Sequence, residues 1–249
     1  MKTILKKTFI AIALCGATLC SFAAEIKPYV SEDALPNMLN FYPAPPDTLS
    51  PQFMYDMSQY MWGKGMRADS ARAALAVAQA VTDIEEMAKM FSEPFGMEIS
   101  AQKTPAIMNL LKRGVTTLKQ VGKRPKNHYM RRRPYDRFNE PSLTPGDEEA
   151  LRHNGSYPSG HTIRAWAMTL LLVEVNPAAQ DALLKYGYEW GQSRVIVGVH
   201  WQSDVDASKV IISGAFASLH SNEAFLTDMR KARDEFKKLS AAKNGKKAK

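Results

Sequence analysis

In several places along the chain a proline residue follows a small polar residue, and we take three of these pairs as helix starts. The pairs are Ser50-Pro51, Thr104-Pro105 and Asn176-Pro177. Such polar side chains accept hydrogen bonds from the free amides of a first helical turn, and proline is tolerated there because its missing N–H would have no partner. The sequence therefore predicts helices that begin at residues 51, 105 and 177.

Apolar residues recur at helical spacing along much of the chain. One stripe follows Thr104, and a second runs from Val77 to Phe91, where Pro94 ends it. A third stripe, near the carboxyl terminus, consists of Phe225, Met229, Ala232, Phe236 and Leu239. No stretch shows the sustained alternation of a β-strand. We therefore expect an all-α fold, a single-domain helical bundle with helices packed around a central helix.

The first residues have the pattern of a secretory signal peptide. Lys2, Lys6 and Lys7 precede an apolar run that ends near Leu19, and small residues follow up to Ala23. The apolar run is shorter than the roughly 20 residues that a membrane span needs. We predict a signal peptide over residues 1–23, a mature domain over residues 24–249, no membrane span, and a periplasmic or fully secreted protein.

Cysteine and lysine positions limit what the mature chain can do. Both cysteines, Cys15 and Cys20, lie in the predicted signal peptide, which leaves no disulfide, metal thiolate or cysteine nucleophile. The formal net charge of +8 comes largely from lysines of the signal peptide and of the last ten residues. We expect residues 240–249 to be a disordered basic tail. No stripe of basic and aromatic residues indicates a nucleic-acid partner.

The segment "SRVIVGVHWQSD", residues 193–204, brings a cation, an imidazole and a carboxylate together. His200 and Asp204 have the spacing that places two side chains on one face of a helix. The carboxylate would accept the proton of one ring nitrogen and leave the other with a free lone pair. Arg194 precedes a segment expected to break the helix, so its guanidinium could reach the imidazole. This group suits attack on an anion, although an ordinary surface pair would have the same spacing.

A second segment, "NGSYPSGHT", predicts an anion site at a helix N-terminus. Ser159 is placed to cap a buried helix over residues 162–175, and the free amides of Gly160 and His161 would point out of its start. Glycine allows a ligand to approach the backbone closely. Taken alone, Ser159 could be only a cap and His161 only a packed polar residue.

A third segment, "KNHYMRRRP", contains Lys126 and Arg133, which alone could be surface charges. Together the three segments match the pattern K-x6-R-P, P-S-G-H, S-R-x5-H-x3-D. This pattern resembles the signature of the type 2 phosphatidic-acid phosphatase and vanadium haloperoxidase superfamily. The chain is similar to the bacterial class A non-specific acid phosphatases over most of residues 40–235. It differs from them at Val197, where relatives often have cysteine, and at Val115, where they tend to have an acidic residue.

The resemblance implies a reaction through a phosphohistidine. It makes His200 the nucleophile and Asp204 the residue that orients His200. It makes His161 the residue that protonates the leaving oxygen and then accepts a proton from water. The phosphate-binding residues it implies are Lys126, Arg133, Ser159, Gly160 and Arg194. Positive charge near His200 should keep its imidazole neutral to lower pH than in a free histidine, which predicts an acidic optimum.

These expectations describe a metal-independent acid phosphatase without a cofactor. Its substrates would be small phosphomonoesters such as nucleotides, sugar phosphates and aryl phosphates, with phosphate transfer to other alcohols as a side reaction. By resemblance it would form a homo-oligomer. One alternative is a vanadate-dependent haloperoxidase. Another is a non-catalytic phosphate-binding protein, which predicts the loss of His161, His200 or Asp204, and the sequence retains all three.

Overall fold

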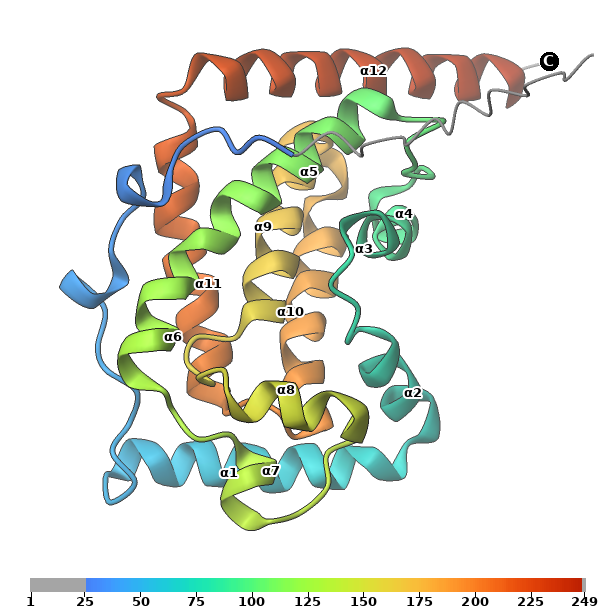
Figure 1. Cartoon of the computed structure of the whole chain (residues 1–249). Helices are drawn as coiled ribbons and strands as arrows, with labels where there is room; N and C mark the ends of the chain where they lie inside the picture. The colour runs from blue at the N-terminus through green and yellow to red at the C-terminus, as the bar shows by residue number, and fades with distance from the viewer. Residues whose placement is uncertain (1–25, 248–249) are drawn as a thin grey trace, which may run out of the picture.

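The computed structural model describes residues 26–247, and the predicted signal peptide lies outside this range (Figure 1). The described residues contain helices and no strand, which confirms the predicted all-α fold. The α-helices are α1 (Pro51–Gly65), α2 (Ser70–Ala78), α3 (Ile84–Met90), α4 (Ser92–Phe95), α5 (Pro105–Leu118), α6 (Lys123–Tyr129), α7 (Pro134–Phe138), α8 (Glu148–Arg152), α9 (Gly160–Val175), α10 (Gln180–Val197), α11 (Gln202–Leu219) and α12 (Glu223–Lys247). Short 3-10 helices cover Glu32–Ala34, Met38–Asn40, Met66–Ala68, Lys119–Gly122, Pro145–Asp147 and Pro177–Ala179.

Helix α9 is the central helix that the sequence predicted. It lies between α5, α10 and α11, and all three contact it (Figure 1). Its buried side chains come from several faces rather than one stripe, as a helix surrounded by others requires. They are Thr162, Ile163, Ala165, Ala167, Met168, Thr169, Leu171, Leu172 and Val175. The start of α9 is therefore held rigidly by the core.

Small residues allow α10 to approach α9 closely. A Cβ added at Gly187 of α10 would lie 2.1 Å from Oγ1 of Thr169, and one at Gly191 would lie 3.3 Å from Cγ2 of Thr162. Both distances are too short for ordinary van der Waals contact. The separation of the two helices thus depends on the absence of side chains at these two positions.

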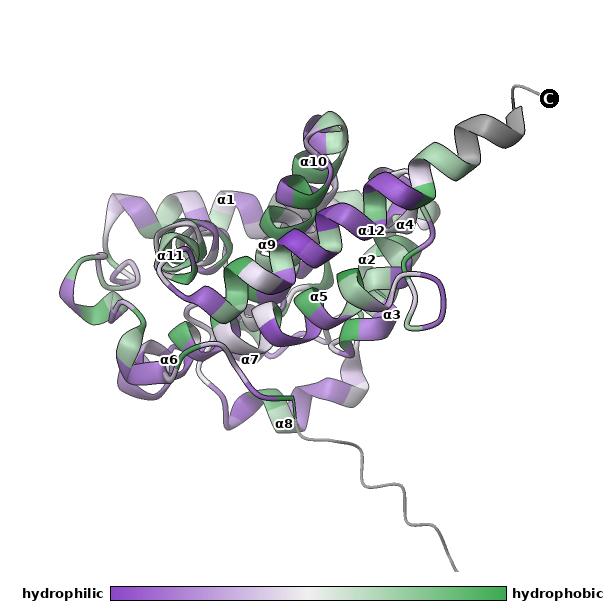
Figure 2. Cartoon of the chain, turned by 90° about the horizontal axis from the view of Figure 1, so that it is seen from above, coloured by the Kyte–Doolittle hydropathy of each residue, from purple (hydrophilic) through white to green (hydrophobic). Residues whose placement is uncertain are grey.

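Helices α1 and α12 lie across opposite ends of the bundle (Figure 1). Hydrophilic and hydrophobic residues alternate in bands along α12, as its predicted apolar stripe implies (Figure 2). Phe225, Met229 and Ala232 of this helix are buried. Because α12 continues to Lys247, it includes most of the segment that the sequence predicted to be a disordered tail.

The predicted helix starts are present, but only one is capped as expected. Oγ of Ser50 accepts the amide of Phe53 at 3.2 Å and caps α1. At α5 the side chain of Thr104 makes no cap, and the carboxylate of Glu235 in α12 accepts two amides at the start of the helix, at 3.0 and 3.1 Å. Pro177 begins a 3-10 turn that leads into α10, and Asn176 makes no side-chain cap there.

The apolar stripe from Val77 to Phe91 is not one helix. α2 ends at Ala78, and α3 begins at Ile84 after Asp83, whose carboxylate accepts the amides of the first turn at 2.9 and 3.0 Å. The cap explains the break, because an aspartate that bonds the following amides favours a new helix start. The loop formed by this break lies beside the first turn of α9, where the carbonyl of Ala80 contacts His161.

None of the helices in the described part of the chain is long and apolar enough to cross a lipid bilayer.

Candidate active site

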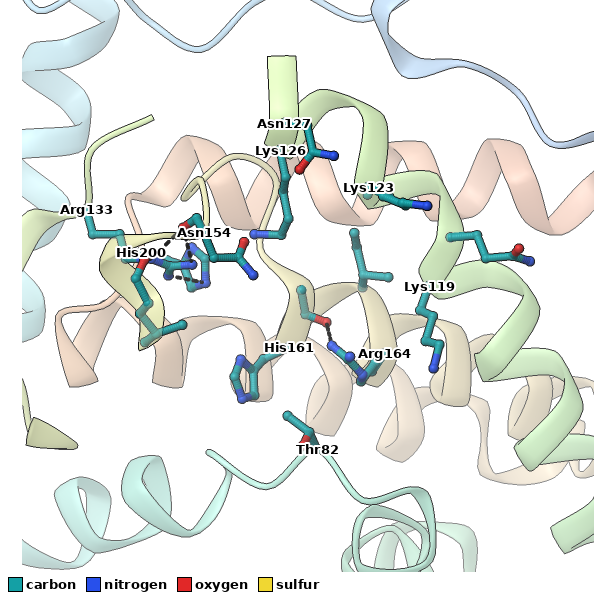
Figure 3. Close-up of a pocket in the computed structure, with 15 residues that line it drawn as sticks. Thr82, Lys119, Lys123, Lys126, Asn127, Arg133, Asn154, His161, Arg164 and His200 are labelled. Carbon is teal, nitrogen blue, oxygen red and sulfur yellow. Dashed lines mark hydrogen bonds between the residues drawn. The ribbon is translucent and has the colours of Figure 1, made fainter. Parts of the chain in front are cut away.

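A cavity of about 480 Å³ opens at the amino-terminal end of α9 (Figure 3). Its wall combines α9 with the segment from the 3-10 helix at 119–122 through α6, and with the loops before α7 and α11. Five of the predicted site residues line it: Lys126, Arg133, Gly160, His161 and His200. The structure thus brings residues from all three sequence segments to one place.

His200 lies in a short connection between two helices, not on a helix face. Gly198 ends α10 in the left-handed conformation with φ 88°, and α11 begins at Gln202 with Trp201 as its N-cap. Asp204 is in the first turn of α11, and its Oδ2 accepts the amide of Trp201 at 2.8 Å. The predicted pairing is present, with His200 Nδ1 3.3 Å from Asp204 Oδ2, but the backbone turn rather than helical stacking produces it.

The hydrogen bonds of His200 determine which ring nitrogen carries the proton. Nε2 lies 3.1 Å from Nη1 of Arg133, and a guanidinium can only donate. Nε2 must therefore be the bare acceptor nitrogen, and the proton is on Nδ1, where Asp204 accepts it. His200 and Arg133 both line the cavity, and Figure 3 shows their side chains next to each other.

Two residues that the sequence analysis missed hold Asp204 in place. Nη1 of Arg131 donates to Oδ1 of Asp204 at 2.5 Å, and Oγ of Ser156 donates to Oδ2 at 2.5 Å. Ser156 is also 3.2 Å from Nδ1 of His200. Burial alone would raise the pKa of Asp204, but Arg131 and the hydrogen bonds from His200 and Ser156 outweigh it and lower that pKa. Asp204 is therefore a carboxylate throughout the working pH range.

Arg131 is itself anchored by a second buried carboxylate, that of Asp56. Its Nη2 donates to Asp56 of α1 at 2.7 Å, and Asp56 also accepts the amide and hydroxyl of Ser203 at 2.8 and 2.6 Å. Arg131 precedes Arg133 by two residues in the run of three arginines, so its position in the motif segment was a signal. The role of Asp56 had no such signal, because it is far from the motifs in sequence.

Burial and neighbouring cations lower the pKa of His200. Its pKa falls from 6.5 to about 3, first because the ring is buried and second because Arg133 is adjacent; the contact with Asp204 opposes this change. The free enzyme therefore holds a neutral imidazole at acidic pH, in the direction that the sequence analysis predicted.

The first turn of α9 presents the groups that the sequence predicted to bind an anion. Ser159 is its N-cap, with Oγ accepting both the amide and the hydroxyl of Thr162 at 3.3 and 2.9 Å. Its own hydroxyl proton remains to be donated. The amides of Gly160 and His161 precede the first intrahelical bond, so they are free to donate to an anion at the positive end of the helix dipole.

His161 has the opposite tautomer to His200. Its Nε2 lies 2.8 Å from the carbonyl oxygen of Ala80, which can only accept, so Nε2 carries the proton and Nδ1 is bare. Burial, then Arg194 and His200, lower the pKa of His161 well below its ordinary value. A phosphate dianion beside it would act in the opposite direction and favour the imidazolium.

Lys126 approaches the same point from α6. Its Nζ donates to the carbonyl of Gly155 at 2.6 Å. Burial and then the charge of Arg133 lower the pKa of Lys126 to about 7. Its ammonium is thus fully charged only on the acidic side of neutrality, unless an anion binds beside it.

Residues 105–225 match the PAP2 superfamily, and this range contains all of the predicted site residues. The chain is 42% identical over 212 residues to the non-specific acid phosphatase of Providencia stuartii, covering 85% of each chain. It is 37% identical over 214 residues to the non-specific acid phosphatase of Salmonella typhimurium, covering 86% of this chain and 85% of that one. The acid phosphatase of Zymomonas mobilis is 36% identical over 198 residues, 79% of this chain and 75% of that one.

The chain belongs to the PAP2 superfamily, among its non-specific acid phosphatases. The family resemblance and the prediction of an enzyme are confirmed by these relatives.

Arg194 lies deeper in this phosphatase than the other predicted cations. It is in α10, fully buried, and does not line the cavity. Its Nη2 donates a hydrogen bond to the carbonyl of Ala76, while its Nε has no partner among the described residues. A buried donor without an acceptor is unfavourable by about 1–3 kcal/mol. The charge of Arg194 acts on His161, whose pKa it lowers.

Among the residues that the structure describes, no carboxylate lines the cation-rich cavity of the phosphatase. Among the described residues, no group of three or more His, Cys, Asp or Glu side chains is arranged to hold a metal ion. The chemistry that this chain offers at the cavity is therefore that of guanidinium, ammonium, imidazole and helix-terminal amide groups.

Proposed function

We propose that this phosphatase hydrolyses small phosphomonoesters through a phosphohistidine formed on Nε2 of His200. The observation that carries the proposal is the tautomer of His200: Asp204 holds the proton on Nδ1, and the bare Nε2 lies at a cavity lined by cations. A neutral imidazole with an oriented lone pair is the form that can attack phosphorus. The sequence retains every residue that the mechanism uses, which favours an enzyme over a binding protein.

In the first step Nε2 of His200 forms a bond to phosphorus as the bond to the leaving oxygen breaks. Nη1 of Arg133, which contacts Nε2 in this structure, would turn to a phosphoryl oxygen. Lys126 and the Gly160 amide line the cavity and would contact the equatorial oxygens. The Ser159 hydroxyl and the charge of Arg194, both buried behind the lining, would help to stabilise the charge that develops on those oxygens. Asp204 stabilises the positive charge that appears on the imidazole.

His161 would move the protons in both steps. Protonated beside the phosphate dianion, it gives the proton on Nδ1 to the leaving oxygen, so the product is a neutral alcohol. The bare Nδ1 then takes a proton from water as that water attacks phosphorus and the N–P bond breaks. Nε2 of His161 keeps its bond to Ala80 throughout, which orients the ring. An alcohol in place of water would give phosphate transfer.

The substrate class, export and assembly are part of the same proposal. Nucleotides, sugar phosphates and aryl phosphates would all present the group that the site recognises, since the cations contact the phosphoryl oxygens rather than the alcohol. We propose that the cations of this chain do this work without a metal ion or a cofactor, and that the signal peptide directs the enzyme to the periplasm.

A homo-oligomer is supported by the surface of α1. Met54 and Met61 are 73% and 59% exposed, and Tyr55 and Trp62 of the same helix are also exposed. Exposed large apolar residues grouped on one helix favour a contact between subunits. Light scattering of the purified protein measures the assembly; a monomer would contradict this part of the proposal.

Trapping the intermediate tests the reaction. The enzyme is mixed with p-nitrophenyl phosphate in excess EDTA at acidic pH, quenched into alkali, and digested for mass spectrometry. We expect a phosphoryl group on His200 and steady release of phosphate. His200→Asn should lose the label and at least ~1,000-fold of kcat. The matched control is His153→Asn, which should keep full activity, since His153 is an exposed histidine that follows α8 and lies outside the cavity.

Two outcomes would contradict the proposal. Full turnover by His200→Asn would remove the nucleophile from the mechanism. Loss of turnover in EDTA, restored by added divalent cation, would show that the cations of the chain do not suffice.

A further inference from the structure

The cavity holds more positive charge than one phosphoryl group needs. Besides Lys126 and Arg133, the described residues of its lining include three more cationic side chains and no carboxylate. These are Lys119, Lys123 and Arg164. In the view of Figure 3, Arg164 and Lys119 lie on the opposite side of the cavity from Arg133 and His200, with Lys126 between them. The proposed mechanism uses none of these three additional cations.

Arg164 lies one helical turn beyond Gly160 in α9 and bends back toward it. Nη1 of Arg164 donates to the carbonyl of Gly160 at 3.0 Å. Among the described residues, the side chain of Arg164 makes this one hydrogen bond and no salt bridge. Because burial lowers the pKa of Arg164, the position is unfavourable for a charge without a partner.

Three other partly buried arginines, Arg131, Arg113 and Arg72, each have at least two hydrogen-bond acceptors. Arg131 binds two carboxylates, and Arg113 binds Asp228 at 2.6 Å. Arg72 donates to the hydroxyl of Ser193 and to a backbone carbonyl. Arg164 differs from these in leaving most of its guanidinium to the cavity, which is the arrangement that an oxyanion ligand would complete.

Gly160 lies between the two cationic groups. A Cβ built on it would be 3.3 Å from Nη1 of Arg164 and 3.7 Å from Cε of Lys126. The phosphoryl site at Lys126 and the guanidinium of Arg164 are therefore neighbours across one glycine. Cavities of this size, about 480 Å³, hold whole small molecules rather than a single phosphate ion.

Lys119 and Lys123 extend the cationic wall outward. Lys119 begins the 3-10 helix at 119–122, and Lys123 begins α6 directly after it. Lys123 has a salt bridge to Glu32 at 3.5 Å, whereas no salt bridge to Lys119 is present in the described residues. Exposed lysines add attraction that salt screens, while the partly buried Arg164 supplies the directional contact.

We propose that Arg164, supported by Lys119 and Lys123, is a second anion subsite that favours substrates with two phosphoryl groups on separate carbon atoms. This inference rests on the proposed function, because one phosphoryl group must occupy the site of His200 while the other binds Arg164. The substrate class is thus a small bisphosphorylated molecule, whose second group is recognised but not cleaved in that binding mode.

The subsite is coupled to the reaction through charge. Arg164 is among the cations that lower the pKa values of Lys126 and His161. An anion bound to Arg164 would oppose this effect and favour the protonated forms of both groups. A substrate with a second phosphoryl group would therefore support the acid form of His161 that the leaving group needs.

The test compares matched substrates that differ only in the second phosphoryl group. We would measure kcat/KM for alkanediol bisphosphates of increasing spacer length and for the corresponding alkyl monophosphates. The readout is kcat/KM for the bisphosphate divided by kcat/KM for the monophosphate. The value for the bisphosphate is first halved, because either of its two identical ends can be hydrolysed. We expect Arg164→Gln to reduce this ratio about 10- to 100-fold, the loss expected for a charged hydrogen bond. Arg164→Lys should retain part of it.

Two further variants separate the subsite from general effects. Lys119→Gln, at an exposed position that should not affect folding, should reduce the ratio by a smaller factor, and added salt should remove this difference. Arg230→Gln is the matched control, because it removes the same charge from the exposed face of α12 and should leave the ratio unchanged.

The outcomes distinguish this inference from the proposed function. A ratio that does not respond to Arg164→Gln and Lys119→Gln, while both substrates are hydrolysed, would overturn the second subsite alone. No hydrolysis of either substrate by the wild-type enzyme would overturn the proposed function and the subsite with it.

Discussion

His200 and His161 have opposite tautomers, and in each a single hydrogen-bond partner determines which ring nitrogen carries the proton. Arg133 can only donate, so it leaves Nε2 of His200 bare, and the carbonyl of Ala80 can only accept, so it places the proton of His161 on Nε2. The sequence predicted both histidines as site residues. It also predicted that the carboxylate of Asp204 would leave one ring nitrogen of His200 bare. It could not predict the tautomer of His161, because its partner Ala80 carries no side-chain signal and lies far from the motif.

The charge on Lys126 sets an upper pH limit for the free enzyme. Its pKa is lowered to about 7 and that of His200 to about 3, so kcat/KM should be highest between these values. Lys126→Arg should move the alkaline limb of kcat/KM for p-nitrophenyl phosphate upward by at least ~1 pH unit, since guanidinium groups hold their protons more tightly.

Both proteins are measured with the same substrate, so the ionisation of the substrate cannot cause a difference between their alkaline limbs. Lys103→Arg, on an exposed lysine paired with Glu98, is the control that should leave the limb in place. An alkaline limb at the same pH in Lys126→Arg and in the wild type would assign it to another group.

At the scale of elements, glycines decide how closely the helices surround α9. Gly187 faces Thr169, and Gly114 of α5 faces Leu171, with contacts that leave no room for a methyl group. The motif residues at the start of α9 hold their positions because the helix behind them is confined on both sides. A hydrophobic pattern can indicate that a helix is buried, but the distance to its neighbours depends on pairs that only the fold brings together.

Gly187→Ala should therefore destabilise the protein even though alanine favours helices. Its Cβ would lie 2.1 Å from Oγ1 of Thr169, and we expect a loss of about 1–3 kcal/mol in the free energy of unfolding, measured by urea denaturation. Thr169→Ala in the same chain should recover part of the loss, because it removes the atom that collides.

Gly214→Ala in α11 is the matched control for this pair. A Cβ at Gly214 meets no atom within 4 Å, so only helix propensity acts and the protein should become slightly more stable. Equal effects of the two substitutions would refute the packing argument.

For the whole molecule, the buried active site makes stability depend on pH. The pKa of His200 is about 3 in the folded protein and 6.5 as an ordinary histidine, so the unfolded chain takes up this proton first as pH falls. Its contribution to stability is complete above pH 6.5 and is lost progressively toward about pH 3. His161 and Asp204 also have lowered pKa values and act in the same direction.

His200→Asn should weaken this pH dependence. Between the two pKa values the wild-type free energy of unfolding should fall faster than that of the variant by about 1.4 kcal/mol per pH unit, the value for one proton. Urea denaturation of both proteins across this range measures the difference. Parallel curves would mean that His200 is protonated alike in the folded and unfolded states.

The sequence alone determined the helical class, the central buried helix, the start of α9 and the segments that form the cavity. These features depend on local rules: apolar spacing, a capping residue and a glycine where backbone approaches a ligand. The helix break before Asp83 also had a local signal, the capping aspartate itself, but the continuous apolar stripe concealed it.

Only the tertiary structure decided the contacts that connect distant residues. The cap of α5 comes from Glu235, the support of Arg131 from Asp56, and the position of Arg164 in the cavity from the approach of α6 to α9. Each is an electrostatic pairing or a burial between segments far apart along the chain. Local patterns indicate which side chains a segment presents, but the partner that completes a buried charge is known only once the helices are packed.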